Sequence, residues 1–339
     1  MVIVIISALT SCDGSDVSLA VDYEVDEPFE SVFIDVSTAT VDVYPTDGDV
    51  ARVSTHDSKR AYHSVTVRDG VLNIEYVDER QWYDYILNTG ITESALAVYL
   101  PEAVYNSLII DASTGHVSVD GLSFERIDIE VSTGQARFNS SSCGSVNIKA
   151  STGDIYMAEV NANDIYVETT TGRARLAAID CESITAKSTT GTVTLVELSA
   201  GSAINVETTS GGVNVSEATA GDVSVGATTG EIMLSGMRCD NATLLSSTGD
   251  IFLDDVIALG AINIDASSGD VTLDKSDAAE IYIHTTTGDV SGTLLSIKKF
   301  TTGTTTGYVD VPGSDGSTDE VCVIHTTTGS ISISIQYKE

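Results

Sequence analysis

The sequence predicts an all-β protein, a single parallel β-helix (β-solenoid) with coils of about 19 residues and an N-terminal cap rich in strands. Two observations predict this fold. Apolar and polar residues alternate through most of the chain, and a Ser/Thr-Ser/Thr-Gly unit recurs among them. The recurring glycines are 19 or 20 residues apart, with a last interval of 22: Gly115, Gly134, Gly153, Gly172, Gly191, Gly211, Gly230, Gly249, Gly269, Gly288, Gly307 and Gly329.

Apolar residues recur at fixed distances from each glycine, seven and five before it and two after it. Around Gly153 these are Val146, Ile148 and Ile155. Alternation with a period of two is typical of strands with one buried face. Short strands within this repeat predict coils whose strands pair in parallel with the next coil, about 4.8 Å away. The crossover rule for parallel strands predicts a right-handed helix.

The recurring glycine marks a corner of each coil, because the inward positions change there from odd to even. Glycine tolerates the positive φ that a corner often requires. The Ser and Thr hydroxyls that precede it can hydrogen-bond to the corner backbone. Since these hydroxyls recur in nearly every coil, we interpret them as architecture and not as nucleophiles.

The first 12 residues resemble a bacterial lipoprotein signal. Val2 to Leu9 is apolar and leads into Leu9-Thr10-Ser11-Cys12, although no Lys or Arg precedes the apolar stretch. The stretch is too short to span a bilayer. The pattern predicts cleavage before Cys12 and lipidation of Cys12, which would anchor the protein to the cell membrane. Residues 13–27 would then be an acidic tether that holds the remaining chain outside the cytoplasm.

Residues 28–112 are expected to form the cap and a degenerate first coil. Val32 to Val43 repeat the coil pattern, with Ala39 in place of the glycine. Val65 to Tyr76 read as a β-hairpin with an Asp-Gly turn. An aromatic cluster follows this hairpin: Trp82, Tyr83 and Tyr85. Two interpretations are open, since the cluster can fill the core of the cap or serve as a stacking platform for a sugar or another ligand.

Residues 113–339 are expected to form the regular solenoid. Three cysteines stand nine residues after a repeat glycine, and a fourth replaces an inward Ile: Cys143, Cys181, Cys239 and Cys322. Because neighbouring coils have alanine at the position nine residues after the glycine, we interpret all four cysteines as free thiols of the core. Pro312 to Asp319 is expected to be a surface loop. His284 and His325 occupy one outward column, but Gly303 lies between them in the intervening coil, so we do not interpret them as a metal site.

Two outward columns carry charge. Directly after the glycine, four successive coils have an acid: Glu231, Asp250, Asp270 and Asp289. Each carboxylate either accepts a nearby backbone N–H or belongs to a weak Ca²⁺-binding row, and both interpretations are open. Four residues before the glycine, five successive coils alternate in sign: Glu130, Lys149, Glu168, Lys187 and Glu207. This alternation predicts salt bridges between neighbouring coils.

Several segments together resemble the bacterial putative-adhesin family, a domain-of-unknown-function family of cell-envelope β-solenoids. These segments are Phe29 with Val32 to Val43, Gly70 to Ile74, Leu96 to Pro101, and the Ser-Thr-Gly-Asp-Ile units at Ser151 and Ser247. The match covers about residues 28 to 339. The resemblance implies a β-helical, non-enzymatic envelope protein, linked in some members to envelope stress, and it supplies no catalytic residues.

Charge narrows the function. With 16 basic and 50 acidic residues the net charge is −34, so the chain should repel nucleic acid. No cofactor is expected apart from weakly bound Ca²⁺. The sequence predicts a non-catalytic binding, adhesion or structural module of the bacterial envelope, with the membrane, envelope proteins or glycans as partners. Two alternatives stay open: a polysaccharide-acting β-helix enzyme, and a scaffold that polymerises through its coil ends.

Overall fold

The computed structural model describes residues 2–6, 19–58, 60–80, 94–313 and 318–336. Their regular secondary structure is all β, and the strands form the turns of a parallel β-solenoid, which confirms the predicted fold class. None of the described residues belongs to a helix long and apolar enough to cross a membrane. The chain divides into two compact units, Met1–Ala162 and Asn163–Glu339, and both contain solenoid turns.

The first unit begins with a cap of mostly antiparallel strands. Its strands are β1 (Val2–Ile6), β2 (Leu19–Val25), β4 (Ala51–Asp57), β5 (Ala61–Arg68), β6 (Val71–Asp78) and β7 (Ser94–Pro101). The predicted hairpin is confirmed, because β5 and β6 pair antiparallel. Both turn residues have positive φ, 50° for Asp69 and 76° for Gly70, as the tight hairpin turn requires. The apolar stretch near the N-terminus forms β1, which pairs antiparallel with β2.

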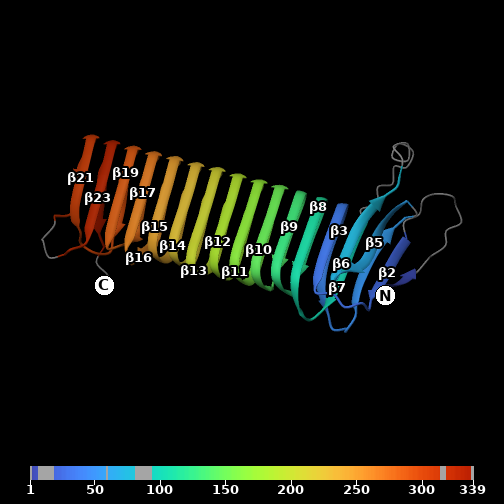
Figure 1. Ribbon diagram of the computed structural model, residues 1–339. Coiled ribbons are helices and arrows are strands. Elements are labelled where there is room, and N and C mark those ends of the chain that lie inside the picture. The colour runs from blue at the N-terminus through green and yellow to red at the C-terminus, as the bar shows by residue number, and fades with distance from the viewer. Residues whose placement is uncertain (1, 7–18, 59, 81–93, 314–317, 337–339) are drawn as a thin grey trace. The chain divides into compact units, whose positions relative to one another are not determined.

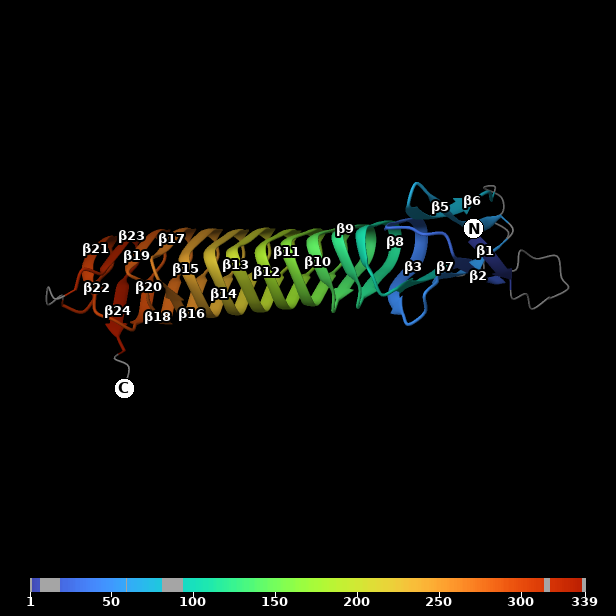
Figure 2. The same ribbon diagram turned by 60° about the horizontal axis from the view of Figure 1, so that its bottom comes forward.

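The degenerate first turn is strand β3 (Ser31–Thr46), and it lies inside the first unit. Along one edge it pairs in parallel with β8 (Val104–Asp120). Along the other edge its first part pairs with β6 and its second part with β7. Figure 2 shows β3 between β8 and the cap strands. The segment that follows β3 in the chain therefore folds back and covers the edge that β3 would otherwise expose.

Long strands bent at the corners make the regular turns. They are β8, β9 (Ser123–Asn139), β10 (Ser142–Thr152), β11 (Ile155–Thr171), β12 (Ala174–Thr190), β13 (Val193–Ser210), β14 (Val213–Thr229), β15 (Ile232–Thr248), β16 (Ile251–Ala258), β17 (Ala261–Ser268), β18 (Val271–Ser276), β19 (Glu280–Thr287) and β20 (Val290–Leu294). Neighbours pair in parallel with equivalent residues opposite each other, as Val146 lies opposite Ile127 and Ile148 opposite Ile129. These side chains are buried, which confirms the predicted inward face.

In the regular turns, the repeat glycine occupies a corner where a side chain would overlap the backbone of a neighbouring turn. Eleven of the twelve repeat glycines have φ between 138° and 151°, a region that side chains rarely adopt. The next turn is also too close, because a Cβ on Gly191 would lie 1.8 Å from the carbonyl oxygen of Gly172. A hydroxyl three residues before the glycine closes the corner, as Thr208 Oγ1 donates to the carbonyl of Gly211 at 2.9 Å. Within the repeated unit itself, Thr229 Oγ1 donates to the carbonyl of Thr209 at 3.2 Å. The predicted role of glycine and hydroxyl is confirmed.

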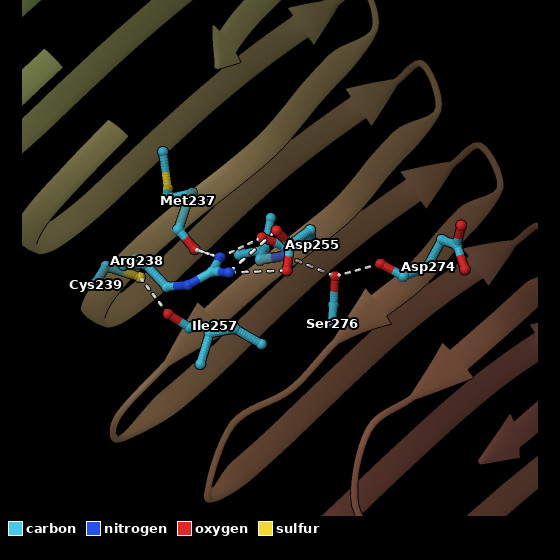
Figure 3. A network of polar contacts seen from close by, with 8 residues as sticks. Met237, Arg238, Cys239, Asp255, Ile257, Asp274 and Ser276 are labelled. Atoms are coloured by element: carbon cyan, nitrogen blue, oxygen red, sulfur yellow. Dashed lines mark hydrogen bonds and ion pairs between the residues drawn. The ribbon is translucent and has the colours of Figure 1, made fainter. Parts of the chain in front are cut away.

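A second corner lies six residues after the repeat glycine, and the sequence analysis missed it. Non-glycine residues adopt left-handed φ of 48° to 56° at this position: Ser140, Glu159, Ala178, Glu197, Glu217, Asp255 and Lys275. At Asp255 a clamp holds the backbone, because Arg238 donates to both carboxylate oxygens at 2.9 and 3.0 Å and to the Asp255 carbonyl at 2.7 Å (Figure 3). Such contacts offset the roughly 1 kcal/mol that a left-handed non-glycine residue costs.

The four cysteines that the structure describes are buried and unbridged, as predicted. Three of them share a column of small core residues with alanines of neighbouring turns, such as Ala200 and Ala258. Burial raises the pKa of the thiols of Cys143, Cys181 and Cys322 to about 12 and that of Cys239 to about 11. These thiols therefore stay protonated and act as packing groups.

The last turns of the second unit do not stack in sequence order. Their strands are β21 (Lys299–Thr306), β22 (Val309–Asp310), β23 (Val321–Thr328) and β24 (Ile331–Ile335). Strand β23 pairs with β19 on one side and with β21 on the other, and β24 lies likewise between β20 and β22. The order β19, β23, β21 is visible in Figure 1. The expected stacking was wrong here, because the chain makes the end turn first and then returns to insert the final turn beneath it.

A buried lysine fixes this insertion. Lys298 precedes β21, and none of its side chain is exposed to solvent. Its Nζ lies 2.5 Å from a carboxylate oxygen of Asp277 and 2.5 Å from one of Glu320, which precedes β23. It also donates to the carbonyl of Ala278 and to Ser296 Oγ. Because a buried charge is tolerated only with such partners, the cluster holds three segments in one arrangement.

Candidate functional site

The second unit carries an open groove of about 530 Å³, here called the lateral groove. It crosses successive turns from β11 to β17, just before their glycine corners. Nine of its sixteen lining residues are Ser or Thr. The lining comprises Glu168, Thr169, Lys187, Ser188, Thr189, Glu207, Thr208, Thr209, Gly226, Ala227, Thr228, Leu245, Ser246, Ser247, Asp265 and Ser267. The groove is thus a row of hydroxyls bordered by a few charges.

Gly226 creates the depth of the groove. It follows Lys187 and Glu207 in the outward column four residues before the corner, and Leu245 follows it. A Cβ at Gly226 would meet no atom within 4 Å, so the position is open space and not a tight backbone contact. The predicted column of alternating charge ended at Glu207. The groove is marked in the sequence by the loss of the side chain at Gly226, where the alternation of charge ends.

An ion pair borders the groove on one side. Lys187 Nζ lies 2.7 Å from Glu207 Oε2, and these residues are opposite each other in β12 and β13. The hydrogen bond to Glu207 and its negative charge raise the pKa of Lys187. The predicted salt bridge is confirmed for this pair. In the first unit, Glu130 and Lys149 also lie opposite each other, as the predicted register requires.

The hydroxyls along the groove differ in what they bind. Those of Thr208 and Ser246 donate to corner carbonyls, to Gly211 at 2.9 Å and to Gly249 at 3.0 Å. The equivalent hydroxyl of Ser188 is buried and has no hydrogen-bond partner among the described residues. A buried hydroxyl without a partner is energetically unfavourable, by about 1–3 kcal/mol.

This chemistry suits a neutral, hydroxyl-rich ligand. The charges of the lining are three carboxylates and one lysine, and the lysine is already paired, so anionic polymers are disfavoured. Hydroxyls at every turn offer donors and acceptors at the strand spacing of about 4.8 Å. Among the residues that the structure describes, no group of three or more His, Cys, Asp or Glu side chains is placed to hold a metal ion.

The predicted carboxylate row uses its oxygens to cap backbone groups. Asp250 Oδ1 accepts the N–H of Asp270 at 2.8 Å, and Asp270 Oδ1 accepts the N–H of Asp289 at 2.8 Å. Asp289 Oδ1 accepts the N–H of Ser330 at 2.7 Å, since the inserted turn follows it. Each carboxylate therefore links its own turn to the next. Binding of Ca²⁺ along the row, which would also include Glu231, stays a prediction.

Two predicted sites lie outside the described residues. The lipidation site Cys12 is one, and the aromatic cluster of Trp82, Tyr83 and Tyr85 is the other. The strands that flank the aromatic cluster in sequence, β6 and β7, both pair with β3. Both sites stay predictions.

Fold and groove together define a class: a β-solenoid repeat protein with a hydroxyl-lined lateral groove. The sequence matches the model of one protein family over residues 29–218, 139–254 and 219–339. The chain belongs to this family, Toastrack DUF4097. No curated protein matches the sequence significantly.

Several crystal structures are similar to the chain. One is a putative adhesin from Bacteroides fragilis, 15% identical, which covers 70% of this chain and 97% of its own with a TM-score of 0.47. Another is a putative lipid binding protein from Parabacteroides distasonis, 15% identical, which covers 80% of this chain and 96% of its own with a TM-score of 0.37. A third is a putative cell adhesion protein from Clostridium sporogenes, 10% identical, with coverages of 93% and 99% and a TM-score of 0.17.

Proposed function

We propose that this protein is a non-catalytic binding module of the bacterial cell envelope, and that its lateral groove takes an extended, neutral, hydroxyl-rich ligand such as a glycan chain. The observation that carries the proposal is the groove itself, with hydroxyls at each turn and open space at Gly226. The exposed hydroxyls of Thr189, Thr209 and Ser247 support it, because they can donate to and accept from ligand hydroxyls.

We also propose that the module lies outside the cytoplasm on a lipid attached to Cys12. The support is the apolar stretch that ends in Leu9-Thr10-Ser11-Cys12. Cleavage before Cys12 would remove β1 and leave β2 with one unpaired edge. In cells of the source organism, Cys12→Ala should release the protein or leave it unprocessed. A variant that fractionates and migrates like the wild type would contradict the anchor.

The groove is tested by filling it. Gly226→Trp places a large side chain in the open space of the groove, at a position where a Cβ meets no neighbour. Thr219→Trp is the matched control, because Thr219 is exposed on the same strand β14 and does not line the groove. Binding of wild type and both variants to a panel of neutral oligosaccharides and peptidoglycan fragments would be measured by calorimetry. We expect Gly226→Trp to weaken binding at least tenfold and Thr219→Trp to leave it unchanged.

Other results would replace the proposal. If the wild type binds none of the panel, or if Gly226→Trp binds as the wild type does, the groove is not a glycan site. If a polysaccharide in the panel is shortened, the protein is an enzyme. If the apparent molar mass measured by light scattering rises with protein concentration, the polymerising scaffold is favoured, because the solenoid ends then associate.

A further inference from the structure

The inserted final turn brings two histidines together. His284 of β19 and His325 of β23 lie directly opposite each other in the parallel register. Gly303, which was expected between them, instead lies on the far side of His325, in β21. The sequence interval of 41 residues therefore hides a pair of imidazoles on adjacent strands.

The two rings share one face and one hollow. Both residues are exposed, and they stand in the outward column of their strands. A hollow of about 300 Å³ is lined by both histidines, together with Asp265 and Tyr282. On the other side of His325, Gly303 contributes no side chain and the ring of His325 lies over it, with Nδ1 3.0 Å from where a Cβ of Gly303 would stand, so the ring must turn away from Gly303 to face His284. Nothing in the lateral groove described above uses these imidazoles.

The spacing suits a shared metal ion. Adjacent strands place the two backbones about 4.8 Å apart. A metal ion bound at about 2.0–2.1 Å by one nitrogen of each ring, at a roughly tetrahedral angle, needs nitrogens about 3.3 Å apart. Two exposed histidine side chains that leave neighbouring strands on the same face can reach this separation by rotation about their side-chain torsions. Neutral imidazole is a preferred ligand of divalent zinc, copper and nickel.

Asp265 supplies negative charge at the same place. It lies opposite His284 on strand β17, on the side away from His325. The described side chains form no group of three metal ligands, so the two imidazoles would be the protein ligands and water would complete the coordination. The Asp265 carboxylate adds attraction for a cation and an acceptor for metal-bound water.

We propose that His284 and His325 form a binding site for one divalent transition-metal ion, of the zinc and copper class. The ion links β19 to β23 and so fastens the inserted turn to the turn beneath it. Neither histidine lines the proposed glycan groove, although Asp265 borders both places, and the metal site does not depend on glycan binding.

The test uses the full untagged chain and the metal ions alone. Calorimetry with Zn²⁺ and Cu²⁺ should show one ion per chain with micromolar affinity, and Zn²⁺ should raise the Tm. His284→Gln and His325→Gln should each weaken binding at least tenfold and abolish the rise in Tm. His56→Gln is the matched control, because it removes an exposed imidazole on β4 of the first unit and should leave binding unchanged.

The same set of measurements reports both folding, through the metal-free Tm, and metal binding. The two histidines are exposed, so the metal-free Tm of each variant should equal that of the wild type. Absence of stoichiometric binding by the wild type at 100 µM metal would overturn the proposal. Wild-type affinity in the His284→Gln/His325→Gln double variant would overturn it as well.

Discussion

The repeat glycine gives the sharpest test of the fold, and Gly191 is a suitable position. Gly191→Ala places a Cβ 1.8 Å from the carbonyl oxygen of Gly172 and 2.7 Å from its carbonyl carbon, at a φ of 138°. Both atoms are backbone, so the overlap cannot be relieved by rotating a side chain. The two turns must move apart, or the corner must change its conformation.

The expected loss of stability is several kilocalories per mole. A non-glycine residue in this φ region costs on the order of 1–3 kcal/mol. Separation of the turns also weakens the backbone hydrogen bond that the Gly172 N–H donates to the carbonyl of Thr190, now 3.0 Å long, which contributes about 1 kcal/mol. Together these give about 2–4 kcal/mol, a large part of the 5–15 kcal/mol typical of a folded domain.

The measurement is urea denaturation followed by circular dichroism, with a matched control in the same unit. Gly226→Ala also adds one methyl group to a glycine, but no atom lies within 4 Å of the new Cβ and φ is not positive. Its free energy of unfolding should change by less than about 0.5 kcal/mol. If Gly191→Ala is as stable as Gly226→Ala, the close stacking of the glycine corners is wrong.

Four further predictions concern charges and thiols. Lys187→Glu should lower the free energy of unfolding by up to about 1 kcal/mol, less at high salt than at low salt, and an equal loss at both would exclude the salt bridge. Millimolar Ca²⁺ should raise the Tm of the wild type but not that of the Asp250→Asn/Asp270→Asn variant, which keeps the side-chain oxygens that cap backbone N–H groups. If the wild-type Tm does not change, capping is the only role of these carboxylates. The four buried cysteines should resist iodoacetamide at pH 8 in the Cys12→Ala protein until denaturant is added, because burial raises their pKa to about 11–12; rapid labelling would place them outside the core. Burial alone would raise the pKa of Glu320, but hydrogen bonds from Lys298 and Ser296 lower it below the ordinary glutamate value. The Glu320 carboxylate should therefore stabilise the fold above the ordinary glutamate range, and this stabilisation should be lost as the pH falls through the lowered pKa. Hydrogen exchange should show β23 opening first in acid, and Glu320→Gln should remove that dependence on pH.

The sequence was sufficient for the architecture because each turn obeys the same local rules. Inward Val and Ile residues, the glycine corner and its hydroxyl recur with fixed spacing. A wrong assignment of one turn in the sequence would therefore be detected by comparison with the neighbouring turns. The salt bridge between Lys187 and Glu207 was predictable for the same reason, since parallel register places equal repeat positions opposite each other.

The remaining features depart from the repeat, so the spacing of the repeat glycines does not predict them. The second corner escaped notice because residues as different as Ala178 and Lys275 adopt the same left-handed φ there. The lateral groove depends on a missing side chain at Gly226, which a search for chemically reactive residues passes over. The insertion of the last turn depends on pairing between strands of nearly identical pattern, and sequence order alone suggested a different partner.

The inserted turn has a consequence for how the protein is made. During synthesis, β21 emerges before β23, and it carries the same repeat that pairs with β19 in a simple stack. For a chain growing at about 5–20 residues per second, β21 has time to pair with β19 before β23 exists. Strand β23 must then displace β21 from β19, unless the edge of β19 is still unpaired when β23 emerges. Maturation of the C-terminal end is therefore expected to include a strand exchange, slower than the zipping of the other turns and dependent on the length of the connection between β22 and β23.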